Sequence, residues 1–242
     1  MPPIPIEACI ACRSPAAVRH SAGEAHRGGA ARIELCRALS TGGLTPPDDH
    51  VRLARAAFPR PGVLVMIRPR AGGFAYSAPE IDRMRAAIEH AAEAGADGVV
   101  LGALKAGRID EAATRTLTAT AHERGLAVTF HRAFDAVPEA EAALEVLMAM
   151  GVERVLTSGT PWHSGAPALD GLDRLAALIG QAERRIEIVV GGGIGPENAA
   201  RVLSALPPGR VSLHAYSSLV REGLTRADRV AALVRQAHTQ PE

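Results

Sequence analysis

Ionisable side chains gather in one short stretch of this sequence, 128–135, which reads VTFHRAFD. Its first three residues have the β-branched and aromatic character of a buried strand. His131, Arg132 and Asp135 follow without a glycine or proline to mark a simple turn. In alternating α/β proteins such groups gather at the carboxyl ends of parallel strands, where loops reach a shared ligand. We therefore expect this stretch to end a strand at a chemical site.

Charged side chains on other predicted strands are expected to point toward the same interior. Because side chains alternate along a strand, Glu7 and Glu34 share the inward face of the first two strands. The same parity turns Arg68 inward from the third strand and His131 from the fifth. A strand covered on both faces should be apolar, so these charges need partners or a ligand. Any one of these charged residues could belong to a buried ion-pair network that only supports the fold. The presence of all of them on one face favours a ligand site.

An enzyme is one interpretation of this ring of charge. His131 can move a proton near neutral pH, with Asp135 or Glu34 as its partner, and Glu7 and Arg68 complete the catalytic set. Residues expected to contact the ligand are Arg70, Tyr76, Arg132, Gly192, Gly193, His214 and Ser217.

A glycine-rich loop, GGGIGPEN at 191–198, follows the seventh predicted strand and precedes a helix. Glycines let the backbone approach a ligand, so Gly192 and Gly193 can bind a phosphate, with a tight turn as the alternative. The sole lysine, Lys105, lies in a loop, which argues against Schiff-base chemistry, and there is no HExxH zinc motif. The expected enzyme is a metal-independent isomerase, lyase or hydrolase of a phosphorylated or carboxylated small molecule, without an organic cofactor.

Metal binding is the other interpretation, and it rests on three cysteines. Thiolates are soft ligands that select soft metal ions. Cys9 and Cys36 end adjacent predicted strands, which lie about 4.8 Å apart, so their sulfurs can approach one ion. Cys12 forms a CxxC with Cys9 and would be a third ligand if its loop folds back, and His214 is a further candidate. The alternatives are a redox pair or small buried apolar side chains.

The elements that must position these residues repeat regularly. Short β-rich runs alternate with Ala-rich helical patterns at a spacing of roughly thirty residues, the size of a βα unit. The runs begin near Ile4, Arg32, Leu64, Gly98, Leu126, Arg154, Glu187 and Val211. These eight units predict a single-domain (β/α)8 TIM barrel over residues 1–242, with an open doubly wound sheet as the alternative.

Two helices of this series have clear boundaries. The helix predicted over 79–94 follows Ser77, with Glu80 three positions later as in a capping box, and ends before a glycine. A second helix is predicted over 140–150, where leucines recur on one face and a glycine follows.

Composition narrows the class of protein. Aromatic residues make up only 3%, so aliphatic side chains must fill the core. The formal net charge of +1 argues against nucleic acid or a membrane surface as a partner. An odd number of cysteines and the lack of an N-terminal signal pattern suggest a reducing, cytoplasmic setting.

Several blocks of the sequence together resemble the signature of one family. They are IEAC (6–9), RIELC (32–36), GGLTP (42–46), MIRPR (66–70), FAYS (74–77), TFHRAFD (129–135) and LTSG (156–159). In this order, over nearly the whole chain, they are similar to the CutC family, named for copper homeostasis. The sequence departs from the family pattern in AGGF, where GGDF is usual and an acidic residue is lost, and in LHAYSS, which replaces a shorter His-x-Ser pattern.

This resemblance implies a cytoplasmic TIM barrel that forms homo-oligomers and handles copper. It does not bring a settled reaction, so whether the protein is an enzyme stays open. The expected partner is a copper ion (Cu+) or a small anionic ligand, with no role for nucleic acid or a membrane.

Overall fold

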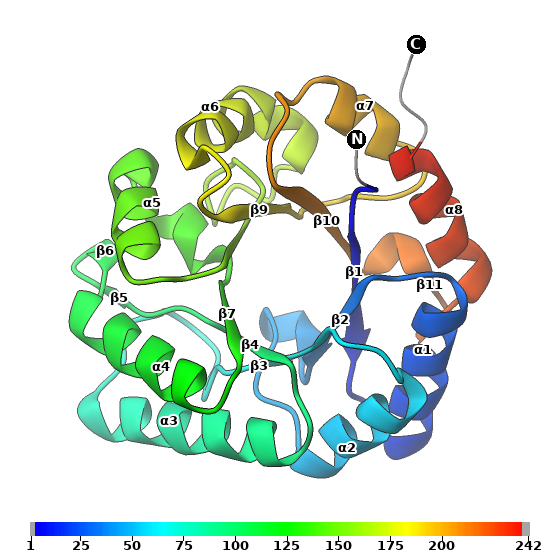
Figure 1. The fold of residues 1–242 in the computed structure, drawn as a ribbon, viewed down its shortest axis with the longest axis horizontal. Helices are drawn as coiled ribbons and strands as arrows, with labels where there is room; N and C mark the ends of the chain where they lie inside the picture. The colour runs from blue at the N-terminus through cyan, green and yellow to red at the C-terminus, as the bar shows by residue number, and fades with distance from the viewer. Residues whose placement is uncertain (1–2, 239–242) are drawn as a thin grey trace.

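Eight parallel strands form a closed ring at the centre of the computed structural model, which describes residues 3–238 (Figure 1). In order around the ring they are β1 (Ile6–Ala11), β10 (Val211–Ala215), β9 (Glu187–Val190), β8 (Arg154–Thr157), β7 (Ala127–Phe130), β4 (Gly98–Leu101), β3 (Val63–Met66) and β2 (Arg32–Cys36). Strand β1 pairs with both β2 and β10, which closes the ring and excludes an open sheet. The predicted TIM barrel is confirmed, although the predicted bounds 1–242 extend beyond the described residues at both ends.

Helices surround the ring, as Figure 1 shows. They are α1 (Pro15–Arg27), α2 (Asp48–Ala57), α3 (Ala78–Glu93), α4 (Glu111–Glu123), α5 (Ala140–Ala149), α6 (Leu172–Ala182), α7 (Ala199–Ser204) and α8 (Ala227–His238). Two short hairpins outside the ring were not predicted. They are formed by β5 (Leu104–Lys105) with β6 (Arg108–Ile109), and by β11 (Val220–Arg221) with β12 (Leu224–Thr225).

The start of α3 shows how local sequence sets these boundaries. The Ser77 N–H donates to Glu80 Oε2 at 2.7 Å, and the Ser77 hydroxyl donates to the same oxygen at 2.9 Å. This capping box satisfies donors that the first helical turn would otherwise leave free. Helices α3 and α5 agree within one residue at each end with the predictions over 79–94 and 140–150.

Side-chain parity along the strands divides the apolar residues into two groups. Outward residues such as Ile33, Leu35 and Val65 belong to the large core between the ring and the helices. Inside the ring a separate small cluster consists of Cys9, Cys36, Leu64, Met66 and Val100. The alternation predicted for these strands is confirmed, and it directs the chemically active side chains into the barrel.

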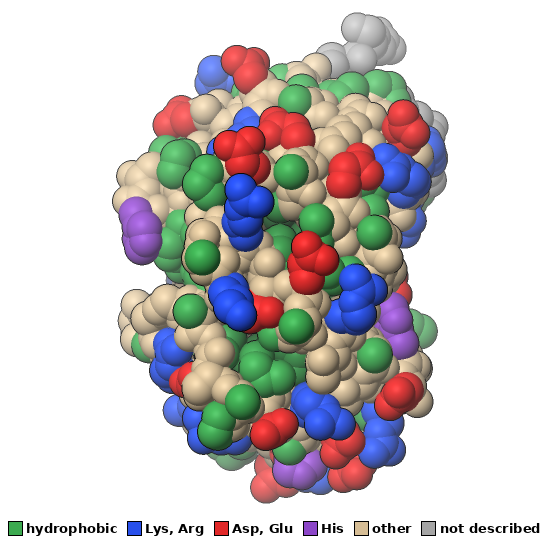
Figure 2. All heavy atoms as spheres, turned by 90° about the vertical axis from the view of Figure 1, so that its left-hand side faces the viewer, with side chains coloured by type: hydrophobic (Ala, Val, Ile, Leu, Met, Phe, Trp, Pro, Cys, Tyr) green, Lys and Arg blue, Asp and Glu red, His purple; other side chains and the backbone are tan. Residues whose placement is uncertain are grey.

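The outer surface over α3, α4 and α5 carries charges of both signs. Figure 2 shows basic and acidic side chains interspersed on this face. Some form ion pairs, such as Arg185 with Glu145 at 3.2 Å and Arg124 with Glu89 at 3.6 Å. Within residues 3–238, no helix combines the length and the apolar character needed to cross a membrane.

Candidate metal and ligand site

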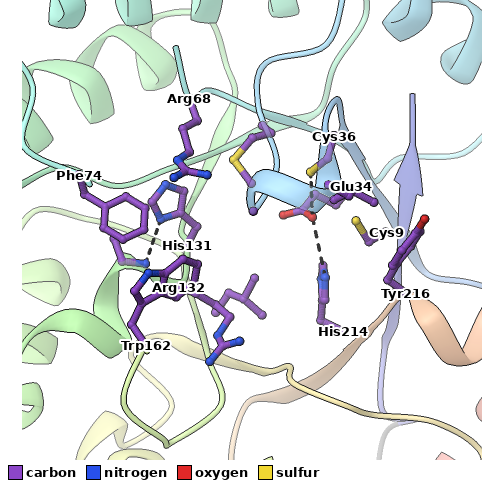
Figure 3. A pocket seen from close by; sticks show the side chains of 15 residues that line it. Cys9, Glu34, Cys36, Arg68, Phe74, His131, Arg132, Trp162, His214 and Tyr216 are labelled. Atoms are coloured by element: carbon purple, nitrogen blue, oxygen red, sulfur yellow. Dashed lines mark hydrogen bonds and ion pairs between the residues drawn. The ribbon is translucent and has the colours of Figure 1, made fainter. Parts of the chain in front are cut away.

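A cavity of about 200 Å³ lies at the carboxyl ends of the barrel strands, and Figure 3 shows its lining. One side, which we call the thiol wall, consists of Cys9, Glu34, Cys36 and His214. The opposite side, which we call the cationic wall, consists of Arg68, Phe74, His131, Arg132 and Trp162. The barrel thus brings seven of the predicted site residues to one cavity, because the ends of parallel strands meet at one face.

The sulfurs of Cys9 and Cys36 approach each other from neighbouring strands. Both sulfurs and one carboxylate oxygen of Glu34 lie within 4.8 Å of one another, and all three residues are buried. The Cys36 sulfur also lies 3.3 Å from Glu34 Oε2, within reach of a hydrogen bond. These three groups form a compact set of potential ligand atoms in the carboxyl-terminal halves of β1 and β2.

Cys9 carries the thiolate of this pair. The hydrogen bond from Cys36 outweighs burial and, together with His214, lowers the pKa of Cys9 to about 5. The same hydrogen bond acts with burial to raise the pKa of Cys36 well above its usual range. At neutral pH the pair therefore holds one proton, which resides on Cys36, and Cys9 is available as a ligand.

His214 is the cation of the thiol wall. Its Nδ1 lies 2.9 Å from Glu7 Oε1, and its Nε2 lies 3.8 Å from Glu34 Oε2. Burial opposes a charge on the ring, but Glu34, Cys9 and Glu7 outweigh it and raise the pKa of His214 well above its usual range. Burial, together with the Cys9 charge, raises the pKa of Glu34. The His214 cation offsets the negative charge on the sulfur.

Glu7 lies beneath the cavity rather than in its wall. Its fully buried carboxylate accepts a hydrogen bond from Arg32 Nε at 3.0 Å. Arg32 also donates to Glu187 at 2.6 Å and to Ser212 at 2.7 Å. Burial would raise the pKa of Glu7, but His214 and Arg32 outweigh it and lower the pKa to about 2. Glu7 therefore belongs to a buried ion-pair network, which the sequence had left open as the alternative to a ligand site.

His131 stands on the cationic wall as a neutral ring. Its Nδ1 accepts a hydrogen bond from the Ala133 N–H at 3.1 Å. Burial, assisted by the Arg68 charge, lowers the pKa of His131 to about 3. Neither of its predicted proton-transfer partners, Asp135 and Glu34, has a hydrogen bond to the ring among the described residues.

Arg68 uses its guanidinium to hold loops at the cavity mouth. Its Nη1 donates to the carbonyls of Thr41 at 2.9 Å and Gly43 at 3.1 Å, and its Nη2 donates to Gly72 at 2.7 Å. The guanidinium carbon lies 5.0 Å from the centre of the Phe74 ring. A bidentate contact between Arg68 and an anion would have to compete with these carbonyls.

Asp135 positions Arg132. The Asp135 side chain is 2% exposed. Its carboxylate accepts hydrogen bonds from Arg132 Nε at 2.7 Å and from the hydroxyl groups of Thr157 and Ser158. Arg132 also donates to Ser158 at 2.7 Å, and its guanidinium lies 5.4 Å from the Trp162 ring. Both charged residues of the TFHRAFD block therefore belong to one rigid network beside the cavity.

Three other predicted site residues lie outside the cavity wall. Cys12 belongs to the outer core, its thiol donates to Ile10 O at 3.9 Å, and burial raises its pKa to about 12. Arg70 pairs with Glu80 at 2.5 Å and covers the Tyr76 ring at 5.0 Å. The structure thus does not place the second thiol of the CxxC with the first, and it gives Arg70 and Tyr76 a loop-forming role.

The glycine loop 191–198 is also separate from the cavity. Gly192 and Gly193 have φ angles of 106° and 73°, which explains the choice of glycine here. A Cβ atom on Gly192 would lie 2.9 Å from the side chain of Ser158, so this backbone packs closely against protein. Ser217 is exposed. None of these predicted ligand contacts is brought to the cavity wall.

Sequence reasoning missed Met66, Phe74 and Trp162 as cavity residues. The inward parity of Met66 was visible, but its thioether was not considered as a ligand. Phe74 and Trp162 come from loops after β3 and β8 and pack with ring centroids 5.2 Å apart. Loop residues have no periodic pattern, so the sequence carried no signal that would place them together.

The donor atoms of the thiol wall fit a soft metal ion. Two sulfurs lie close together, and Met66 adds a thioether to the same cluster inside the barrel. Thiolate and thioether ligands select Cu(I) among the common metal ions, while carboxylates suit harder ions.

Comparison with known proteins agrees with the motif blocks. The sequence matches the CutC family over residues 5–218. The human copper homeostasis protein cutC homolog is 46% identical over 203 residues, which cover 84% of this chain and 71% of the human protein. A CutC protein of Vibrio cholerae is 44% identical over 195 residues, covering 80% and 74% of the two chains. The crystal structure of CutC from Streptococcus agalactiae has a TM-score of 0.78 at 31% identity, over 87% of this chain and 98% of that one. This protein belongs to the CutC family.

Proposed function

We propose that this protein binds Cu(I) between Cys9 and Cys36 and thereby serves copper homeostasis in the cytoplasm. The observation that carries the proposal is the buried pair of sulfurs, which lie with a Glu34 oxygen within 4.8 Å of one another. The human relative is named a copper homeostasis protein. Soft thiolates are the ligands that Cu(I) prefers.

The charges around the sulfurs support this ion. Binding of Cu(I) displaces the proton of Cys36, and the resulting complex of one Cu(I) ion with two thiolates carries one net negative charge. The His214 cation, whose charge is maintained by Glu34 and Glu7, lies beside the sulfurs to offset it. Buried charge is costly unless it is paired, so this cation stabilises the loaded site.

Burial supports retention of the ion over rapid exchange. Cys9 is 2% exposed and Cys36 is 1% exposed, so competing thiols in solution have little access to the metal. We propose that the protein stores or senses Cu(I), with exchange through the cavity mouth.

The enzyme interpretation has weaker support. His131 lacks the carboxylate partner that proton transfer was expected to use, and Glu7 is bound in ion pairs beneath the cavity. Of the predicted catalytic set, Glu34, Arg68 and His131 line the cavity, while Glu7 and Asp135 are held in networks outside its wall.

Competition for Cu(I) with a chromogenic chelator under reducing conditions tests the copper proposal. We expect Cys9→Ala and Cys36→Ala each to lower the Cu(I) affinity by at least about 100-fold, because removal of a direct ligand should cost more than a change in the surrounding shell. Cys12→Ala is the matched control, since it removes a buried thiol outside the cavity, and it should leave the affinity unchanged. Equal affinities for the wild type and both cavity variants would refute the proposal.

A further inference from the structure

The cationic wall has a buried hydrogen-bond donor without an acceptor. His131 is 4% exposed and lines the cavity, and its Nε2 has no partner among the described residues. Buried polar groups are nearly always hydrogen-bonded, and an unsatisfied one costs about 1–3 kcal/mol. A copper ion bound at the thiol wall would not serve as the partner of His131 Nε2, because that wall lies on the other side of the cavity (Figure 3).

The contacts of the ring determine which nitrogen carries the proton. Nδ1 accepts from the Ala133 N–H at 3.1 Å, so the proton of a neutral ring must be on Nε2. The Nδ1 edge also lies against Gly102, where a Cβ atom would meet the ring at 2.6 Å. Gly102 thus leaves space for this orientation, and Phe74 packs on the ring at 5.1 Å. His131 is held as a fixed donor whose Nε2 has no acceptor among the described residues.

The surroundings of this donor favour an acceptor with negative charge. Arg68 is close enough to lower the pKa of His131, and its guanidinium binds the backbone carbonyls of Thr41 and Gly72. Arg132 lines the same cavity, where Asp135 holds its guanidinium in position. The Arg68 charge beside this donor, together with Arg132 elsewhere on the same cavity lining, favours an oxyanion.

The rest of the cavity is suited to hydrocarbon. Met66, Leu156, Phe74 and Trp162 contribute apolar surface to its lining. Its volume of about 200 Å³ is several times the roughly 30 Å³ that one water molecule occupies in the liquid, so it has room for more than one metal ion. Ligand sites commonly combine such apolar walls with a few fixed polar groups.

We propose that this cavity binds a small organic acid, whose carboxylate oxygen accepts a hydrogen bond from His131 Nε2 while its hydrocarbon body packs against Phe74 and Trp162. Arg132 supplies a second donor or a neighbouring positive charge. This ligand occupies the cationic wall and leaves the sulfurs of Cys9 and Cys36 free. The proposal goes beyond copper binding and does not depend on it.

The protein contains one tryptophan, Trp162, and this residue lines the cavity, so its fluorescence reports on occupancy. The test titrates the protein with a series of short carboxylates from acetate to isovalerate, and with isovaleramide as a neutral counterpart. We expect saturable fluorescence changes that are strongest for the branched acid. The amide should bind at least about tenfold more weakly, because it lacks the charge that strengthens the hydrogen bond.

Variants separate a specific site from general binding. His131→Leu should weaken isovalerate binding by roughly tenfold, whereas His131→Gln retains an N–H donor of similar reach and should restore part of it. His163→Leu is the control, because it removes an exposed histidine that packs beside Trp162, and it should bind normally. The double variant Cys9→Ala, Cys36→Ala should lose Cu(I) and still bind isovalerate.

The proposal is overturned if no acid gives a saturable change up to tens of millimolar, or if acid and amide bind equally well. Equal binding by the wild type and His131→Leu would also overturn it. None of these results bears on Cu(I) affinity, so failure of the carboxylate site and failure of the copper site can be told apart.

Discussion

Cys9 and Cys36 lie two residues out of register on adjacent strands, yet their sulfurs lie within 4.8 Å of each other. In the pairing of β1 with β2, Cys9 is opposite Glu34, and Cys36 is opposite Ala11. A strand spacing of about 4.8 Å and a rise of about 3.3 Å per residue place the two Cα atoms roughly 8 Å apart. Disulfide bonds need Cα atoms closer than about 7 Å. The pair is therefore suited to share an ion and unsuited to form a disulfide.

This offset predicts that the thiols resist oxidation to a disulfide. After treatment with diamide, removal of the reagent and unfolding, we expect Ellman's reagent to detect all three cysteines, as in the untreated protein. Cys12→Ala should give two under both conditions. Loss of two thiols in the wild type and in the Cys12→Ala variant would show that Cys9 and Cys36 had joined.

Met66 offers a test of the third soft ligand. Met66→Leu conserves most of the side-chain volume, which makes the cost in stability small. We expect it to lower the Cu(I) affinity by roughly tenfold, the scale on which partners of a metal site act. Met84→Leu in the outer core is the matched control. If both variants bind Cu(I) like the wild type, Met66 serves only to fill space.

Arg32 is predicted to be a major determinant of stability, although it lies outside the cavity wall. Arg32→Met would leave the carboxylates of Glu7 and Glu187 without their shared cation. Removing one member of a buried ion pair costs about 3–5 kcal/mol, which urea unfolding would measure. Arg185→Met, which breaks an exposed pair with Glu145, should leave the unfolding midpoint almost unchanged. Similar midpoints for the two variants would contradict this assignment.

The lowered pKa of His131 predicts that the stability of the folded protein depends on pH. Its pKa is lowered from 6.5 to about 3, so between these values the unfolded chain takes up a proton that the folded protein refuses. The unfolding free energy must then fall as the pH falls from 6.5 toward 3, by at most about 1.4 kcal/mol per pH unit from this group. His131→Gln should remove this contribution and flatten the curve. Parallel curves for the two proteins would show that His131 titrates normally.

Strand parity allowed much of the site to be predicted from sequence. Cys9, Cys36 and His131 were expected to face the barrel interior from the ends of their strands, and each lines the cavity. The alternation of side chains does not predict the direction of a side chain that follows the last residue of a strand. The direction of Cys12, three residues after Cys9, depends on how the loop folds, and the structure places it in the outer core.

The partners of the charged residues could not be predicted in the same way. Arg68 donates to the backbone carbonyls of Thr41 and Gly43, which lie 27 and 25 residues earlier in the sequence, and every residue type has such a carbonyl. Asp135 is bound by Arg132 and by hydroxyl groups after β8, which left His131 without its expected partner. Arg32 could have been found, since it shares the inward parity of Glu34.

The copper site is tested most directly by X-ray absorption spectroscopy of the protein loaded with Cu(I). We predict a first coordination shell dominated by sulfur in the wild type and in Cys12→Ala. In the double variant Cys9→Ala, Cys36→Ala this signal should be lost, together with stoichiometric copper. A shell of nitrogen or oxygen in the wild type, or an unchanged sulfur signal in the double variant, would contradict the account.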